Sequence, residues 1–140
     1  MANLTHKIGL GAVESAIYAR LTTDPLTLSY TVGIYLPPNT ALPYVSIGGG
    51  LWGKSRDFTT RDDKAEDVVV HAHVWSSQHN DDEVTAMMNN ISQAVTASVL
   101  SISGYTEMIG ITDYAQILID ATNPNQLLRH GVLRFRFQIA

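Results

Sequence analysis

The sequence of 140 residues contains no cysteine and no long apolar run, and each absence excludes a class of protein. Without cysteine, the chain cannot be a small secreted domain held together by disulfides. No run approaches the length needed to cross a bilayer, and residues 1–7 lack the pattern of a signal peptide, so we expect no membrane association. The length predicts one domain, over residues 1–140, that buries a sizeable core without the help of a metal.

Positive charge is also scarce, since the formal net charge is −4. An acidic chain is poorly suited to gripping a polyanion such as DNA. The charges gather in one segment, which contains Lys54, Arg56, Asp57, Arg61, Asp62, Asp63, Lys64, Glu66 and Asp67. We expect a charged protruding loop at about residues 51–66. Such a loop is either a solvated surface or, because its signs are mixed, a segment that pairs with a neighbouring subunit.

Two stretches alternate with a period of two, which predicts strands with one buried face. In residues 132–139 the buried positions are apolar, and the open face carries Arg134 and Arg136, whose charges need water, a carboxylate or another chain. In residues 68–75 an aliphatic face alternates with a face that contains His71, His73 and Trp75. Each predicted strand therefore has one face for the core and one for a surface.

Helical spacing appears twice. An apolar stripe predicts a helix over residues 10–21, ended by Asp24-Pro25. Asn80 is a candidate cap for a second helix, whose stripe continues to Ile102 and which Gly104 ends. Further strands are predicted at residues 28–36, at 43–47 with three glycines after it, and at 112–121.

This order of elements predicts an α+β domain with a largely antiparallel sheet of four to five strands and two helices packed on one face. The other face is then expected to carry the polar positions of the strands, namely His71, His73, Trp75, Tyr114, Gln116, Arg134 and Arg136. No internal repeat competes with this arrangement.

Residues 48–55 spell the nucleotide-binding pattern G-x-x-x-x-G-K-[ST], and residues 117–120 resemble an apolar strand ending in a magnesium-holding Asp. The pattern works only when a helix begins at its Lys and Ser and presents backbone amides to the phosphates. Residues 56–63 have no apolar stripe and weak helical preference. We therefore keep a nucleotide-binding protein as the alternative hypothesis. The simpler interpretation is that the glycines allow the chain to turn at the end of a strand.

Other chemistries have weaker support. His71 and His73, with His79 or Asp81, include metal-ligand types, but no ligand spacing accompanies them, so we predict no metal, no cofactor and no catalytic residue. No serine lies in a nucleophile elbow. Aromatic and arginine side chains on an open sheet face can stack on bases, although the acidic balance counts against a nucleic-acid platform. A domain of this size can also be an adaptor or a toxin-associated binding module.

The chain resembles a known family over about residues 10–139. The resemblance rests on a short amino-terminal helix, the segment Leu42-Pro43-Tyr44-Val45-Ser46-Ile47-Gly48, the strand Val70-His71-Ala72-His73-Val74-Trp75-Ser76, the long helix after it, and the closing stretch from Arg129 to Phe137. These features are similar to those of the tail-completion proteins of long-tailed bacteriophages and gene transfer agents. Members are also called tail terminators or head-tail joining proteins.

The resemblance implies a structural virion protein without enzymatic activity, assembled in the host cytoplasm. It implies a hexameric ring at the head-proximal end of the tail that stops tail-tube polymerisation and offers a joining surface. The implied partners are other copies of the chain, the tail-tube protein and head-completion or connector proteins, while DNA passes through the lumen without sequence-specific binding. We expect the charged segment and the polar sheet face to make these contacts, with Lys54, Arg56, Asp57, Arg61, Asp62, Asp63, Lys64, Glu66, Asp67, His71, His73, Arg134 and Arg136 as the interface residues.

Overall fold

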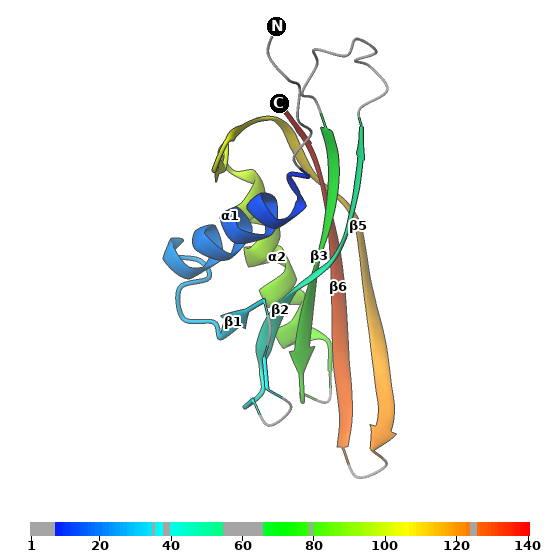
Figure 1. The fold of residues 1–140 in the computed structure, drawn as a ribbon. Coiled ribbons are helices and arrows are strands. Elements are labelled where there is room, and N and C mark those ends of the chain that lie inside the picture. Colours follow the sequence, from blue (N-terminus) through cyan, green and yellow to red (C-terminus); the bar gives the residue numbers. More distant parts are fainter. Residues whose placement is uncertain (1–7, 35, 38–39, 55–65, 79, 124–125) are drawn as a thin grey trace, which may run out of the picture.

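The computed structural model describes residues 8–34, 36–37, 40–54, 66–78, 80–123 and 126–140. In chain order its elements are α1 (Leu10–Thr23), β1 (Val32–Gly33), β2 (Tyr44–Lys54), β3 (Glu66–Ser76), α2 (Asp82–Thr96), β4 (Ser101–Ile102), β5 (Tyr105–Asn123) and β6 (Gln126–Ile139). The strands form one six-stranded sheet in the order β1-β2-β3-β6-β5-β4. All neighbouring strands are antiparallel except β1 and β2. Figure 1 shows both helices on the same face of the sheet.

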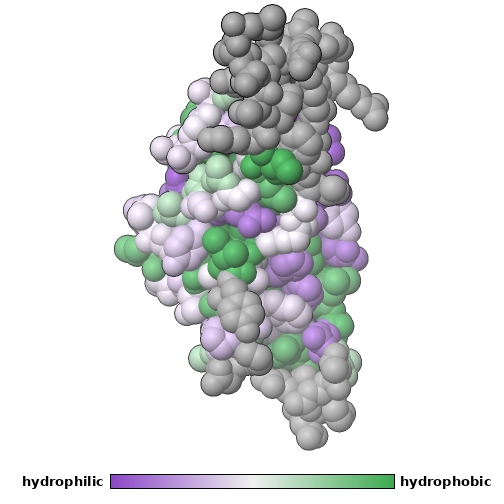
Figure 2. All heavy atoms as spheres, viewed as in Figure 1, coloured by the Kyte–Doolittle hydropathy of each residue, from purple (hydrophilic) through white to green (hydrophobic). Residues whose placement is uncertain are grey.

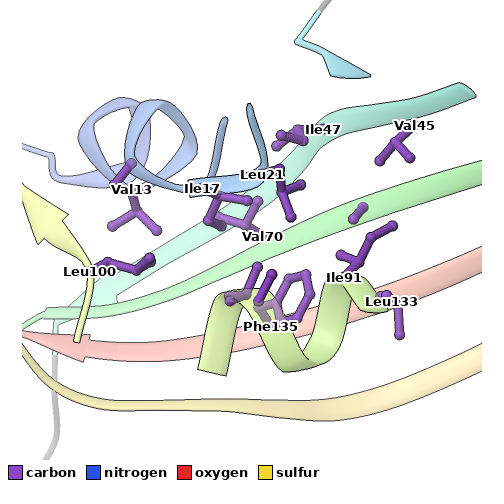
Figure 3. Close-up of a cluster of buried hydrophobic side chains, with 14 of the residues drawn as sticks. Val13, Ile17, Leu21, Val45, Ile47, Val70, Ile91, Leu100, Leu133 and Phe135 are labelled. Atoms are coloured by element: carbon purple, nitrogen blue, oxygen red, sulfur yellow. The ribbon is translucent and has the colours of Figure 1, made fainter. Parts of the chain in front are cut away.

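The core lies between the helices and the inner face of the sheet, as the alternating patterns predicted. β3 buries every second residue along its whole length, and β6 places Phe135 and Phe137 in the interior with no exposed surface. Val13, Ile17 and Leu21 of α1 cover one part of the sheet, while Ile91 of α2 lies over Phe135 and Leu133 (Figure 3). Burying a side chain of this size stabilises the fold by roughly 1.5–3 kcal/mol.

Arg20 joins the two helices. Its guanidinium donates hydrogen bonds to the carbonyl oxygens of Ala94, at 2.8 Å, and of Val99, at 3.0 Å. These carbonyls belong to the end of α2 and the residues that follow it, where backbone acceptors lack partners inside the helix. One side chain of α1 therefore caps the end of α2.

Several predicted boundaries were wrong. The sheet has six strands because the two-residue strand β4 was not predicted, since it lies within the apolar spacing assigned to the second helix. The second helix ends at Thr96, and Val99 of the predicted stripe is 63% exposed. Gly104 lies after β4, with a φ of +81°, so it serves a turn between strands and does not end a helix.

The strand predictions also missed two extensions. β2 continues through its glycines to Lys54, because Gly49, with a φ of +70°, lies at an irregularity in the pairing with β3 that the strand passes without stopping. β5 begins at Tyr105 and not at residue 112. Among the described residues of the predicted strand over residues 28–36, only Val32–Gly33 pairs, with β2. Among the described residues, no helix is long and apolar enough to cross a membrane.

Candidate interaction surface

The face of the sheet without helices carries the polar and aromatic side chains that the alternation predicted, together with aliphatic residues of β5 such as Ile109 and Ile111. The pairing register places His71 of β3 opposite Arg134 of β6, and Arg134 in turn opposite Tyr114 of β5. The guanidinium carbon of Arg134 lies 5.2 Å from the centre of the Tyr114 ring, within the range of a cation–π contact. We call this helix-free side of β2, β3, β6 and β5 the polar face.

One carboxylate holds both arginines of β6. Asp113 Oδ1 accepts a hydrogen bond from Arg134 Nε at 2.9 Å, and Asp113 Oδ2 lies 3.4 Å from Arg136 Nε. The hydrogen bond to Asp113 is the main cause that raises the pKa of Arg134. Two guanidinium groups share one carboxylate here, and the Arg136 side chain is 57% exposed. This part of the polar face therefore keeps a positive charge available to another molecule.

A second cluster joins imidazole and indole rings. His73 Nδ1 and His130 Nε2 are 2.9 Å apart and share a hydrogen bond, and the His130 ring stacks on Trp75 with 3.8 Å between ring centres. His71 Nδ1 donates to the carbonyl oxygen of Gly49 at 2.6 Å. Partial burial, and then the neighbouring imidazole, lower the pKa of both His73 and His130. His73 and His130 therefore favour the neutral form and act as hydrogen-bonding aromatic groups.

The charged segment divides between described and undescribed residues. Lys54 is the last residue of β2, and Asp67 pairs in register with Gln138 of β6. Arg56, Asp57, Arg61, Asp62, Asp63 and Lys64 lie outside the described residues. The strands also extend into both ends of the range predicted as a loop, because β2 reaches Lys54 and β3 begins at Glu66.

Glu66 has a structural position. Its side chain is buried, and its Oε2 accepts a hydrogen bond from the backbone N–H of Gly9 at 2.9 Å, just before α1 begins. A carboxylate near the first turn of a helix also suits the helix dipole. The role of Glu66 in this subunit is thus to fix the start of α1 against β3.

The described residues of the nucleotide-binding pattern do not have the backbone conformation of a phosphate-binding loop. Residues 48–54 belong to β2, and the ladder with β3 pairs Gly48 with His71 and Lys54 with Glu66. A phosphate-binding loop needs its amides directed at the ligand from a turn at the start of a helix, whereas an extended paired strand uses them in the sheet. The described part of the pattern therefore lacks the geometry of a nucleotide site.

The described residues contain a shallow hollow of about 400 Å³ on the helix side, between α2 and β5. Met88, Ala115, Ile117 and Leu133 supply apolar walls, and Asn89 and Gln116 add amides. A hydrogen bond of 2.7 Å between Ser92 and Thr112 joins its two sides. Among the described residues there is no group of three or more His, Cys, Asp or Glu that could hold a metal.

Two residues of the polar face were not predicted from the sequence. His130 could have been found, because it continues the period-two pattern of Arg134 and Arg136 towards the start of β6. Asp113 could not, because it is the extra residue where the register between β5 and β6 shifts, and a simple alternation predicts the opposite face for such a residue.

Comparison of the sequence with known protein families identifies the family of the chain. Residues 15–140 match the sequence profile of the family described as Tail completion protein gp17, so the chain belongs to that family. It is a structural component of the virion, in the tail of a bacteriophage or related particle, and not an enzyme. No curated protein is significantly similar to the chain in sequence.

Two solved structures share the fold. A chain in the virion of a native gene transfer agent particle has 18% sequence identity and a TM-score of 0.77, with 92% of this chain and 95% of that chain covered. The gp17 protein of bacteriophage SPP1 has 24% identity and a TM-score of 0.58, with 100% and 97% covered. These likenesses extend over essentially the whole domain.

Proposed function

We propose that the protein forms a hexameric ring at the head-proximal end of the tail, where it stops tail-tube polymerisation and provides the surface that joins the tail to the head. The observation that carries this proposal is membership of the tail-completion family over residues 15–140. A protein that completes a tail must bind the last tube ring on one side and head-completion or connector proteins on the other.

The two clusters of the polar face suit such contacts. Arg134 and Arg136 share one carboxylate and can accept a second from a partner, since guanidinium groups bind carboxylates in a planar, directed way. His71 and His73, with Trp75 beside them, add an aromatic area of the kind that is enriched at interfaces. We assign these residues to contact with the tube or with head proteins.

The charged segment is the second part of the proposed interface. Its mixed signs, from Lys54 to Asp67, favour pairing with a neighbouring subunit in which unlike charges meet. The negative net charge of the chain suits a ring through which DNA slides without being held. The pairing of subunits and the passage of DNA both depend on the proposed ring.

Two measurements test the proposal. Native mass spectrometry of the protein, alone and on purified tail tubes, should show a species at six times the 15.3 kDa of one chain. Particles produced without the protein should contain tails of abnormal length and heads that are not joined, as seen by electron microscopy. A plasmid copy of the wild-type gene should restore both features. Normal tails joined to full heads in its absence would contradict the proposed function.

A further inference from the structure

β5 is an unusually open edge strand. It runs from Tyr105 to Asn123, yet β4 pairs only with Tyr105 and Thr106. From Glu107 onward, no strand in the described part of the chain lies on the side of β5 that faces away from β6. A long edge of unpaired backbone groups binds other strands readily unless it is protected.

The usual protection is missing. Residues 108–119 contain no lysine, arginine or proline, and the single charged residue, Asp113, is engaged by two arginines of β6. Apolar side chains are exposed on both faces of the strand, with Ile109 at 54%, Ile111 at 45% and Ile119 at 62%. Figure 2 shows hydrophobic residues at the surface on the side of the molecule where β5 lies. Such an edge is suited to being covered by another chain.

The opposite side of the sheet offers a matching edge. β1 pairs only with Val45 and Ser46, so no described strand covers the outer edge of β2 from Ile47 to Lys54. Between Tyr44 and Gly53, β2 has no charged residue to repel an incoming strand. A Cβ built on Gly48 meets nothing within 4 Å, so a side chain can be introduced at this position of β2.

The strand directions fit as well. β2, β3, β6 and β5 are joined by three antiparallel pairings, so β5 runs antiparallel to β2. A second copy generated by rotation about an axis parallel to the strands has its strands in the same directions as the first. The β5 of one copy therefore meets the β2 of the next in antiparallel orientation. Two unlike edges give a head-to-tail contact, which closes into a ring when the rotation closes.

We infer that the outer edge of β5 forms an antiparallel ladder with β2 of a second copy of this chain, so that neighbouring subunits share one sheet. The inference deepens the proposed ring and rests on it. It adds backbone hydrogen bonds and apolar side chains to the contact between subunits that the charged segment is proposed to make. The polar face then stays free for tube and head proteins.

The ladder identifies a residue for the test. Thr106 of β5 and Ala140 exchange both backbone hydrogen bonds. Such pairs alternate along an antiparallel ladder, so β5 residues opposite even-numbered residues of β6 direct their amides to β6. Those opposite odd-numbered residues direct their amides to the open edge. Ala115 lies opposite Leu133 and therefore directs its amide to the open edge. Ala115→Pro removes that donor and places a ring in the path of an added strand, while the monomer loses no ladder bond. Ala115→Thr keeps the amide and is the matched control.

The oligomer is measured by native mass spectrometry, for the purified protein and for tails that carry it, with circular dichroism as the check on folding. We expect Ala115→Pro to reduce the assembled fraction at least tenfold and Ala115→Thr to leave it near the wild-type value. A folded Ala115→Pro protein that assembles as the wild type does would overturn the shared sheet and leave the ring intact. A wild-type protein that forms no ring in either sample would refute the proposed function itself.

Because the chain has no cysteine, disulfide mapping provides an independent readout. Gly48→Cys is combined with a single cysteine in β5, at Ile109, Ile111, Gln116 or Leu118 in turn, and disulfide-linked chains are scored on denaturing gels. An antiparallel ladder predicts that moving the first cysteine to Gly53→Cys shifts the best β5 partner towards the start of β5. A shift in the other direction, or dimers that need only a β5 cysteine, would contradict the inference.

Discussion

At the scale of single residues, Gly131 shows how closely α2 lies on the sheet. A Cβ built on Gly131 would come within 2.6 Å of Met88 Sδ and 2.9 Å of Val84 Cγ2, both on α2. The helix can occupy its place only because β6 has no side chain at this position. The periodic pattern of the sequence did not indicate this requirement.

We predict that Gly131→Ala lowers the free energy of unfolding by about 1–3 kcal/mol, the usual cost of overpacking a filled interior. Gly48→Ala is the control, because its Cβ meets nothing within 4 Å in the subunit. Urea denaturation of both variants measures the difference. Equal midpoints for the two variants would show that α2 moves without cost.

The imidazole pair leads to a prediction about pH. Folding lowers the pKa of His73 and His130, whereas the unfolded chain keeps a value of about 6.5. Below that pH the unfolded chain binds protons that the folded chain does not, so the free energy of unfolding should fall as the pH drops below about 6.5 and stay level above it. His130→Gln should flatten this dependence in urea titrations.

The comparison of wild type with His130→Gln isolates the effect. Glu107, whose burial raises its pKa, contributes in the opposite direction at lower pH, but it does so in both proteins. Parallel profiles between about pH 7.5 and 5.5 would mean that the hydrogen bond between the two imidazoles carries no pH-dependent stability.

At the scale of elements, β3 and β5 should differ sharply in hydrogen exchange. β3 is paired on both sides along most of its length, so its amides should exchange slowly throughout. In the monomer, the amides of Ala115 and Ile117 should exchange quickly, while those of Gln116 and Leu118, directed at β6, should exchange slowly. Nuclear magnetic resonance resolves this alternation, and uniform protection along β5 would contradict it.

The elements also show what the sequence could predict. Strong alternation in β3 and β6 identified both strands and their buried faces, because a half-buried strand has a clear period of two. The end of α2 was misplaced, because Val99 and Ile102 continue the helical spacing, although Val99 is exposed and Ile102 joins the core through β4. β5 was recognised only in part, since both of its faces are largely exposed and burial imposes little pattern on it.

The candidate surface was predictable to the same extent. His71, His73, Arg134 and Arg136 follow from the alternation of two strands, and the structure brings them together on the polar face. The role of Glu66 in fixing α1 was not predictable, because its partner is the backbone of Gly9, far away in sequence. Asp113 escaped because a change of register reverses the side on which a residue lies.

At the scale of the whole molecule, the surfaces of the subunit differ in composition. The helices and the inner face of the sheet make the core, the polar face gathers arginine and imidazole groups, and the two outer edges of the sheet are unlike each other. A contact between two unlike edges is head-to-tail, so each subunit can bind one neighbour through β5 and another through β2. The proposed ring uses this property of the sheet.

The bridge made by Arg20 has a consequence for cooperativity. Carbonyls at the end of α2 and in the residues just after it accept hydrogen bonds from a residue more than seventy positions earlier in the chain. A fragment that holds only the second helix and the later strands would expose those acceptors, and a fragment that ends before them would leave a long cation without its ligands. The polypeptide is therefore expected to fold all at once, with neither half stable by itself.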